Sequence, residues 1–360
     1  MRSFLAASLV VLAGCGTASG FDNPGTGTDA GIALGDGGGI AFDKDAACAT
    51  NVEPTTRAPG GVVLVVDQSF SMSQDPDGNT AKLPGDAKWD VAQPALIDLV
   101  KGLPAGLDLG LELFPSAIGC SVASSPQVGL GDINGTRSSV ISTLSGAGPV
   151  GDTPTTPALN TAYKALGGAS GLGAKVVVFL SDGEPNCGST ESSVQIAVGD
   201  ALKKFGIKTY VIGVPGSPYT AFSKLAVAGG TRRDPKCLEV CDASWSDIDK
   251  CCHYVTSASD FKKSLTQALG EIAAQLKTNC VYKVPHPKTG FDPGLINVVV
   301  SVDGKTEIII GQSADPNADG WSYTDGTYDY VILHGKLCTD VLAWQSSRVE
   351  VVVGCPTQVK

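Results

Sequence analysis

The residues best suited to chemistry stand at the end of an aliphatic run. Residues 62–66 read Val-Val-Leu-Val-Val and lead into Asp67, after which hydroxyl side chains follow at every second position, Ser69 and Ser71. Carboxylate and hydroxyl oxygens are hard ligands, which suit magnesium, manganese or calcium better than zinc or copper. The pattern therefore indicates a candidate site for a divalent cation.

The apolar run also indicates how these oxygens are positioned. Consecutive branched aliphatic residues after a glycine pair are typical of a strand buried on both faces, as in the parallel sheets of α/β domains. Ligand sites in such sheets lie beyond the carboxyl ends of the strands. We therefore expect Asp67 and the two serines to lie at a binding crevice.

Two further segments offer oxygen ligands in a similar setting. Residues 151–157 read Gly-Asp-Thr-Pro-Thr-Thr-Pro before a predicted helix, and they contribute Thr153. A second strongly apolar strand, residues 175–180, ends in Ser-Asp-Gly-Glu and contributes Asp182. Each feature alone is weak, since hydroxyl-rich loops often only cap helices. Their joint occurrence, in this order and on these elements, is a much stronger signal.

Together the three motifs, Asp-x-Ser-x-Ser, Gly-x-Thr-x-Thr and Asp-Gly-Glu, resemble the metal-ion-dependent adhesion site of von Willebrand factor type A domains. The likeness covers about residues 58–278. In that family the hydroxyls coordinate a divalent ion, the acids bind it directly or through water, and one position is left for a carboxylate of the partner. The resemblance implies Mg²⁺, with Mn²⁺ or Ca²⁺ as alternatives, and the ligands Asp67, Ser69, Ser71, Thr153 and Asp182. The alternative is a type A fold whose site holds no ion.

The order of the predicted elements gives the fold class and the domains. Strands alternate with helices from about residue 56, which predicts an α/β fold, a doubly wound and mostly parallel sheet flanked by helices. We assign residues 56–280 to this Rossmann-like type A domain, with a cysteine-rich insertion at 232–253. Beyond it, short strands separated by Asp, Asn and Gly turns predict a small all-β domain at 281–360, stapled by disulfides.

The N-terminal residues predict export. A basic start and an apolar run up to Ala13 are too short for a membrane span and are typical of a signal peptide, residues 1–14. Leu-Ala-Gly-Cys resembles the bacterial lipobox, which implies lipidation of Cys15; the alternative is an uncleaved anchor. Residues 15–55 are rich in Gly and Asp and predict a flexible linker. Since no acid directly follows Cys15, the resemblance favours the outer membrane and leaves the periplasmic or surface side open.

The cysteine count fits an oxidising compartment. A lipidated Cys15 leaves ten of the eleven cysteines, an even number that favours disulfides over a zinc cluster of the insertion's four cysteines with His253. From topology we expect Cys120 and Cys187 to brace the metal loops, and the insertion's four to pair among themselves. A terminal clasp between Cys48 and Cys280 follows from the family resemblance. The candidates are Cys48, Cys120, Cys187, Cys237, Cys241, Cys251, Cys252, Cys280 and a C-terminal pair, Cys338 and Cys355.

Composition and missing motifs exclude several function classes. With 26 Lys plus Arg and a net charge of -10, the chain is a poor partner for nucleic acid. Haloacid-dehalogenase-type phosphatases carry a second acid two residues after the nucleophile, and here that position is Ser69. The chain has no Gly-x-Ser-x-Gly elbow, and its three histidines do not flank the metal loops in sequence. We predict that the protein is not an enzyme.

The sequence thus predicts a lipid-anchored protein of the bacterial cell envelope. Its type A domain is expected to bind a protein or glycan partner through a divalent cation, with the partner offering a carboxylate to the metal. A structural envelope protein, with a constitutive metal site and no metal-dependent partner, is the alternative. A phosphatase or another hydrolase is a remote third.

Overall fold

The computed structural model describes residues 51–54, 58–241, 250–277, 280–286, 291–302, 306–315, 318–324, 328–343, 348–354 and 357. The predicted signal peptide, the lipidation site Cys15, and both Cys48 and Cys355 lie outside the described residues. Among the helices that are described, none is long and apolar enough to cross a membrane.

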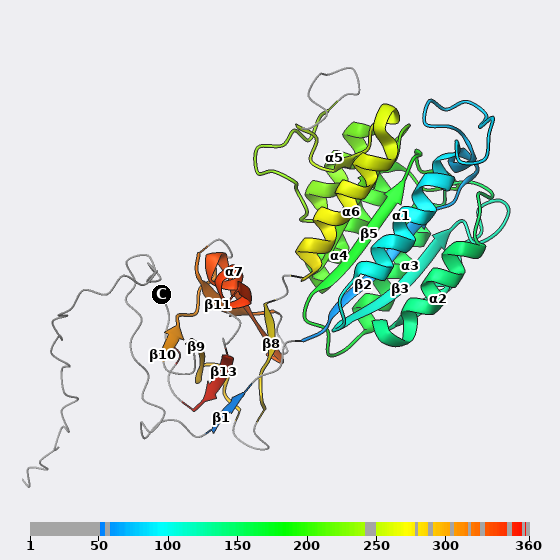
Figure 1. The fold of residues 1–360 in the computed structure, drawn as a ribbon. Coiled ribbons are helices and arrows are strands. Elements are labelled where there is room, and N and C mark those ends of the chain that lie inside the picture. The colour runs from blue at the N-terminus through cyan, green and yellow to red at the C-terminus, as the bar shows by residue number, and fades with distance from the viewer. Residues whose placement is uncertain are drawn as a thin grey trace, which may run out of the picture. The chain divides into compact units, whose positions relative to one another are not determined.

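A six-stranded sheet forms the centre of the α/β region (Figure 1). Each strand runs parallel to its neighbour except β4, which is antiparallel to β3. The doubly wound, mostly parallel sheet predicted from the sequence is thereby confirmed. In sheet order the strands are β4 (Val128–Asp132), β3 (Leu107–Phe114), β2 (Gly60–Asp67), β5 (Lys175–Ser181), β6 (Ile207–Gly213) and β7 (Tyr254–Val255).

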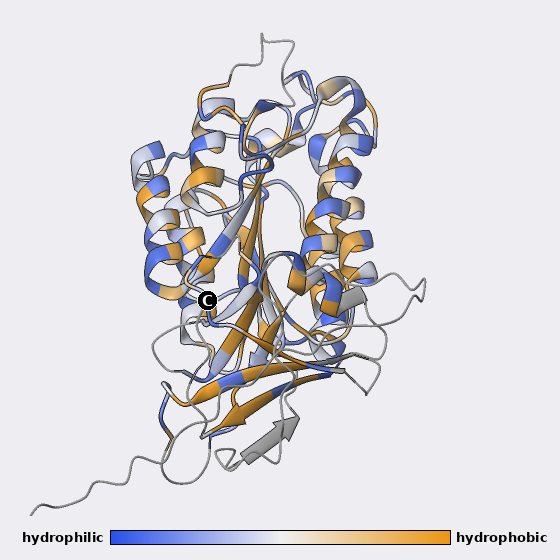
Figure 2. Ribbon diagram, turned by 90° about the vertical axis from the view of Figure 1, so that its left-hand side faces the viewer, coloured by the Kyte–Doolittle hydropathy of each residue, from blue (hydrophilic) through white to orange (hydrophobic). Residues whose placement is uncertain are grey.

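Helices cover both faces of this sheet because its central strands are apolar on both sides. Along β2, Val62, Leu64 and Val66 enter one hydrophobic cluster, and Val63 and Val65 enter the other. Figure 2 shows the apolar strands between helices that also carry hydrophilic residues. Helices α1 (Lys88–Gly102), α2 (Ile133–Gly146) and α6 (Phe261–Lys277) pack in the first cluster, and α3 (Thr155–Gly168), α4 (Glu191–Phe205) and α5 (Tyr219–Ala228) in the second.

The strand register places the candidate ligands at one edge of the sheet. Val66 pairs with Leu180 across β2 and β5, so Asp67 and Ser181 leave the two strands at the same level. On the other side of β2, Asp67 is opposite Phe114, the last residue of β3. A short 3-10 helix, η1 (Phe70–Ser73), follows β2 directly. The loops after all three strands therefore begin together.

The C-terminal region is built mainly of strands, as predicted, and these strands form two antiparallel sheets. One has the order β1 (Asn51–Pro54), β13 (Arg348–Val353), β9 (Ile296–Val302) and β10 (Thr306–Ile310). The other has the order β11 (Gly320–Tyr323), β12 (Tyr330–His334) and β8 (Val281–Lys283). The hydrophobic core of this region is a cluster of buried residues from both sheets, and it includes the fully buried Trp321.

Two features of this region differ from the predictions. Residues 51–54, assigned above to the flexible linker, form β1 and pair with β13. The partner strand lies near the other end of the chain, so local composition does not reveal the pairing. Helix α7 (Gly335–Ala343) is also unpredicted; its Leu337 and Val341 are four residues apart and are both buried.

The predicted pairings of Cys280 and Cys338 are wrong, because these two cysteines bond to each other. The fold explains the pairing. The carbonyl of Cys280 accepts a hydrogen bond of 3.0 Å from the amide of Leu333 on β12, and α7, which carries Cys338, follows that strand immediately. The pairing of β8 with β12 thus brings Cys280 close to Cys338.

Candidate metal centre

Asp67 ends β2 with its side chain buried and both carboxylate oxygens hydrogen-bonded. Its Oδ1 accepts from the Ser69 amide at 2.8 Å, and its Oδ2 accepts from the Ser181 hydroxyl. Burial raises the pKa of Asp67 to about 7, and the negative charge of Asp182 adds to this, while the hydrogen bonds oppose it. Two carboxylates that influence each other at such a site favour a bound cation.

The two predicted serines connect this loop to Asp182. Ser69 Oγ lies 3.0 Å from Ser71 Oγ, and Ser71 Oγ donates to Asp182 Oδ1 at 2.8 Å. Ser71 and Asp182 are far apart in the sequence, and the adjacency of β2 and β5 brings them together. Four of the five predicted ligands therefore belong to one group of neighbouring side chains.

Thr153 borders the same group from the loop before α3. That loop is fixed against the β2 loop, because the Phe70 amide donates to the carbonyl of Gly151 at 2.9 Å. The Thr153 amide donates to Asn186 Oδ1 at 2.7 Å. A Cβ placed on Gly183 would lie 3.7 Å from Thr153 Oγ1 and 3.9 Å from Ser71 Oγ. Both hydroxyls thus lie next to the Asp-Gly step after β5.

The expected disulfide between Cys120 and Cys187 is present beside these loops, with 5.6 Å between the Cα atoms. The Cys120 loop packs closely on the Thr153 loop. A Cβ on Gly151, whose φ is 64°, would lie 2.5 Å from the carbonyl oxygen of Gly119. Only glycine fits this contact, which keeps the two loops together.

Sequence reasoning missed Lys88, the first residue of α1. Its side chain is only 3% exposed, and its Nζ forms an ion pair with Asp182 Oδ2. Nζ also donates to the carbonyl of Pro215 at 3.2 Å. No sequence signal could have found this contact, because a lysine at the start of a helix usually faces solvent. Ser181 was also missed, although its position beside Asp182 was a hint.

The donor set suits a hard divalent cation. It combines two buried carboxylates with three hydroxyls, from Ser69, Ser71 and Thr153, and it contains no sulfur or imidazole. Oxygen-only donors of this kind suit Mg²⁺, Mn²⁺ or Ca²⁺. The residues present therefore fit the ion that the sequence motifs imply.

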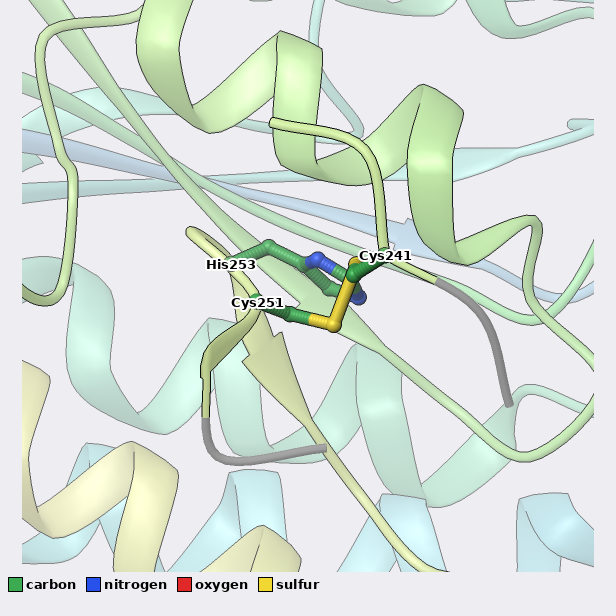
Figure 3. A group of neighbouring side chains, drawn as sticks. All are labelled: Cys241, Cys251 and His253. Atoms are coloured by element: carbon green, nitrogen blue, oxygen red, sulfur yellow. A yellow bond between two sulfur atoms is a disulfide. The ribbon is translucent and has the colours of Figure 1, made fainter. Parts of the chain in front are cut away.

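The insertion's four cysteines pair among themselves, as expected, in the disulfides Cys237–Cys252 and Cys241–Cys251. Figure 3 shows His253 beside the second of these bonds. Its Nδ1 lies 3.0 Å from Ser223 Oγ, and burial lowers the pKa of His253 to about 3. Because a cysteine binds zinc only as a thiolate, the alternative of a zinc cluster does not fit these four oxidised cysteines.

Comparison with known proteins agrees with the fold. The family model of the von Willebrand factor type A domain matches residues 61–250. Among curated proteins, the uncharacterized protein YwmC of Bacillus subtilis is 28% identical over 180 residues, which cover 48% of this chain and 74% of YwmC.

Several solved structures are similar at low sequence identity. The PilB minor pilin of Streptococcus sanguinis is 18% identical with a TM-score of 0.44, covering 61% of this chain and 62% of PilB. The von Willebrand factor domain of the pilus tip protein Mfa5 from Porphyromonas gingivalis is 11% identical with a TM-score of 0.41, covering 65% and 99%. The match thus spans about three fifths of the PilB chain. Since the family model covers more than half of the chain, the protein belongs to the von Willebrand factor type A domain family.

Proposed function

We propose that the protein binds a protein or glycan partner through a divalent cation, with Mg²⁺ as the first candidate and Mn²⁺ or Ca²⁺ as alternatives. The observation that carries this proposal is the convergence of Asp67, Ser69, Ser71, Thr153 and Asp182 from three loops at one edge of the sheet. Asp67 and Asp182 supply the negative charge, and the hydroxyls supply neutral oxygen ligands. A bound cation would offer its remaining coordination position to a carboxylate of the partner.

The surroundings of the site support a partner more than a purely structural role for the metal. Phe70 lies between Ser69 and Ser71 in the sequence, and its side chain is 68% exposed. Ile118 lies in the loop that the Cys120–Cys187 disulfide holds, and its side chain is 85% exposed. Large exposed apolar side chains beside a polar centre are typical of protein interaction sites. A structural site has no need of them.

The contacts of the site favour binding over catalysis. Asp67 accepts hydrogen bonds at both of its oxygens, and Asp182 is shared between Ser71 and Lys88. Among the described residues, the hydrogen bonds of these two acids include no histidine, so the pairing of a serine with a histidine base that many hydrolases use is absent there. We therefore propose a binding module and not a hydrolase.

We further propose that the protein is a lipoprotein of the bacterial outer membrane, anchored through Cys15. The signal-peptide and lipobox patterns support this placement. Four disulfides among the described residues fit an oxidising compartment. Mass spectrometry of the protein extracted from membranes tests the anchor, since Cys15→Ser should remove both the lipid and the membrane association.

Calorimetric titration with Mg²⁺ and with Mn²⁺ tests the metal site. Wild type should bind one ion per chain, and Asp67→Ala should abolish this binding. Asp98→Ala is the matched control, since Asp98 is exposed on α1 and pairs with Lys101. Equal binding by wild type and Asp67→Ala would refute the site. Pull-down of partners with and without a chelator then separates the adhesive role from the structural alternative.

A further inference from the structure

Lys88 introduces a fixed positive charge into a site that is otherwise built for a cation. Its ammonium contacts Asp182 Oδ2, while the other oxygen of the same carboxylate accepts from Ser71. The side chains of Lys88 and Asp182 are both almost completely buried, so solvent screens the pair very little. Any ion bound beside Asp182 therefore interacts with this ammonium as well as with the acids.

The fold holds the ammonium in place. The backbone amide of Lys88 donates to the carbonyl of Gln74 at 2.8 Å, which ties the start of α1 to the end of the metal loop. The neighbouring Trp89 is buried, and its Nε1 donates to the carbonyl of Ala147 at 3.2 Å. Nζ itself reaches the Pro215 carbonyl in the loop after β6. With its backbone and its tip both held, the side chain cannot simply swing into water.

The formal charges then define what the site can hold. With a cation bound, Asp67 and Asp182 are both ionised and together carry two negative charges, which a divalent ion alone would neutralise. Lys88 cancels one of them, so the same ion leaves the buried group with one excess positive charge. Excess charge in a buried group is costly. One carboxylate from outside restores neutrality.

We infer that Lys88 makes the site bind a divalent cation weakly on its own and tightly together with an external carboxylate. The inference rests on the proposed function and deepens it. Because coupling between two bound species is reciprocal, the metal strengthens carboxylate binding by the same factor. Lys88 is thus a positioning residue that makes metal occupancy depend on an acidic partner.

Removal of the charge tests this inference, with Mn²⁺ as the metal and acetate as the carboxylate probe. Electron paramagnetic resonance reports free Mn²⁺ directly. Without acetate, Lys88→Met should bind Mn²⁺ about tenfold more tightly than wild type. Acetate should strengthen Mn²⁺ binding to wild type several-fold and leave Lys88→Met unchanged. Lys101→Met, which removes an exposed lysine from the same helix, should behave as wild type.

Lys88→Gln provides a second variant in case Lys88→Met does not fold, because an amide can still donate to Asp182 or to Pro215 without a charge. Circular dichroism and cooperative unfolding verify each fold. If the folded uncharged variant and wild type bind Mn²⁺ equally and respond equally to acetate, the inference is overturned while the metal site stands. If neither binds Mn²⁺ with or without acetate, the proposed metal function fails and the inference falls with it.

Discussion

Two buried acidic groups in the same sheet contrast sharply. At the carboxyl edge, Asp67 and Asp182 have hydrogen-bond or ionic partners at both oxygens. In the middle of β3, Glu112 is buried opposite Val65, and neither of its oxygens has a partner among the described residues. Burial raises the pKa of Glu112 to about 8.

The contrast follows from where each residue lies on its strand. Where strands end, loops bring hydroxyls, amides and Lys88 to the carboxylates, so burial produces an organised polar centre. Inside the sheet, Glu112 lies opposite the aliphatic Val65, and the backbone groups of β3 are already used in hydrogen bonds between the strands. A buried acid there costs stability and organises nothing around it. Burial combined with partners distinguishes the candidate metal centre from Glu112.

The largest effect is expected from breaking the ion pair of the metal centre. Asp182→Ala leaves the Lys88 ammonium buried without its anionic partner. We expect a loss of about 3–5 kcal/mol in the free energy of unfolding. Urea denaturation without added metal measures it.

A double variant makes this prediction specific. Lys88→Met with Asp182→Ala removes both charges and should recover most of the loss, since no unpaired charge then remains. Equal stability of the Asp182→Ala single variant and the double variant would show that the ion pair is not the source of the loss.

The next largest effect is expected from the Cys120–Cys187 disulfide, which links the loops beside the metal centre. Cys120→Ser with Cys187→Ser removes a disulfide between residues 67 positions apart, which should lower the free energy of unfolding by about 2–4 kcal/mol. Mn²⁺ affinity should fall as well, because the loops carrying Thr153 and Asp182 lose their link. Thermal unfolding and Mn²⁺ titration measure the two effects. Unchanged affinity in the folded variant would separate the brace from the site.

Sequence reasoning identified those parts of the site that rest on local pattern. The apolar run before Asp67 and the hydroxyl spacing after it predicted a strand end with oxygen ligands, and strand alternation predicted the sheet that unites them. The brace followed from the same topology, because Cys120 and Cys187 each follow a strand that ends at this edge. The hydrophobic pattern and the order of the elements along the chain were sufficient to predict these features.

Other features depend on contacts that no local pattern contains. Lys88 lies at an ordinary helix start, and only the packing of α1 turns it toward Asp182. The sequence around Glu112 does not reveal that helices cover both faces of its strand and bury the side chain. Cys280 was assigned to a clasp with Cys48, but pairing of β8 with β12 brought it to Cys338 instead. In each case tertiary neighbours decided what the residue does.

Glu112 itself predicts a smaller, pH-dependent effect. Its folded pKa is raised from 4.5 to about 8, so the folded state favours the neutral acid. Its contribution to stability is therefore largest below pH 4.5 and is lost as the pH rises toward 8. Glu112→Gln cannot ionise and should be more stable than wild type at pH 8.5, by on the order of 2 kcal/mol.

The measurement is the difference in unfolding free energy between Glu112→Gln and wild type at several pH values from 5 to 9. The difference should grow with pH, because only wild type must ionise a buried group. A constant difference would mean that Glu112 ionises as readily in the folded chain as in the unfolded one.

The smallest effect is expected from an ion pair of the same chemistry outside the core. Lys101 and Asp98, at the solvent side of α1, are 3.2 Å apart with side chains 59% and 76% exposed. Lys101→Ala should change the free energy of unfolding by no more than about 0.5 kcal/mol, since water solvates both charges before and after the change. Urea denaturation at low and high salt measures it. A loss comparable to that of Asp182→Ala would show that burial does not set the strength of these pairs. If the loss of unfolding free energy is negligible, the importance of Lys88 to the metal centre comes from burial and not from the lysine–aspartate contact itself.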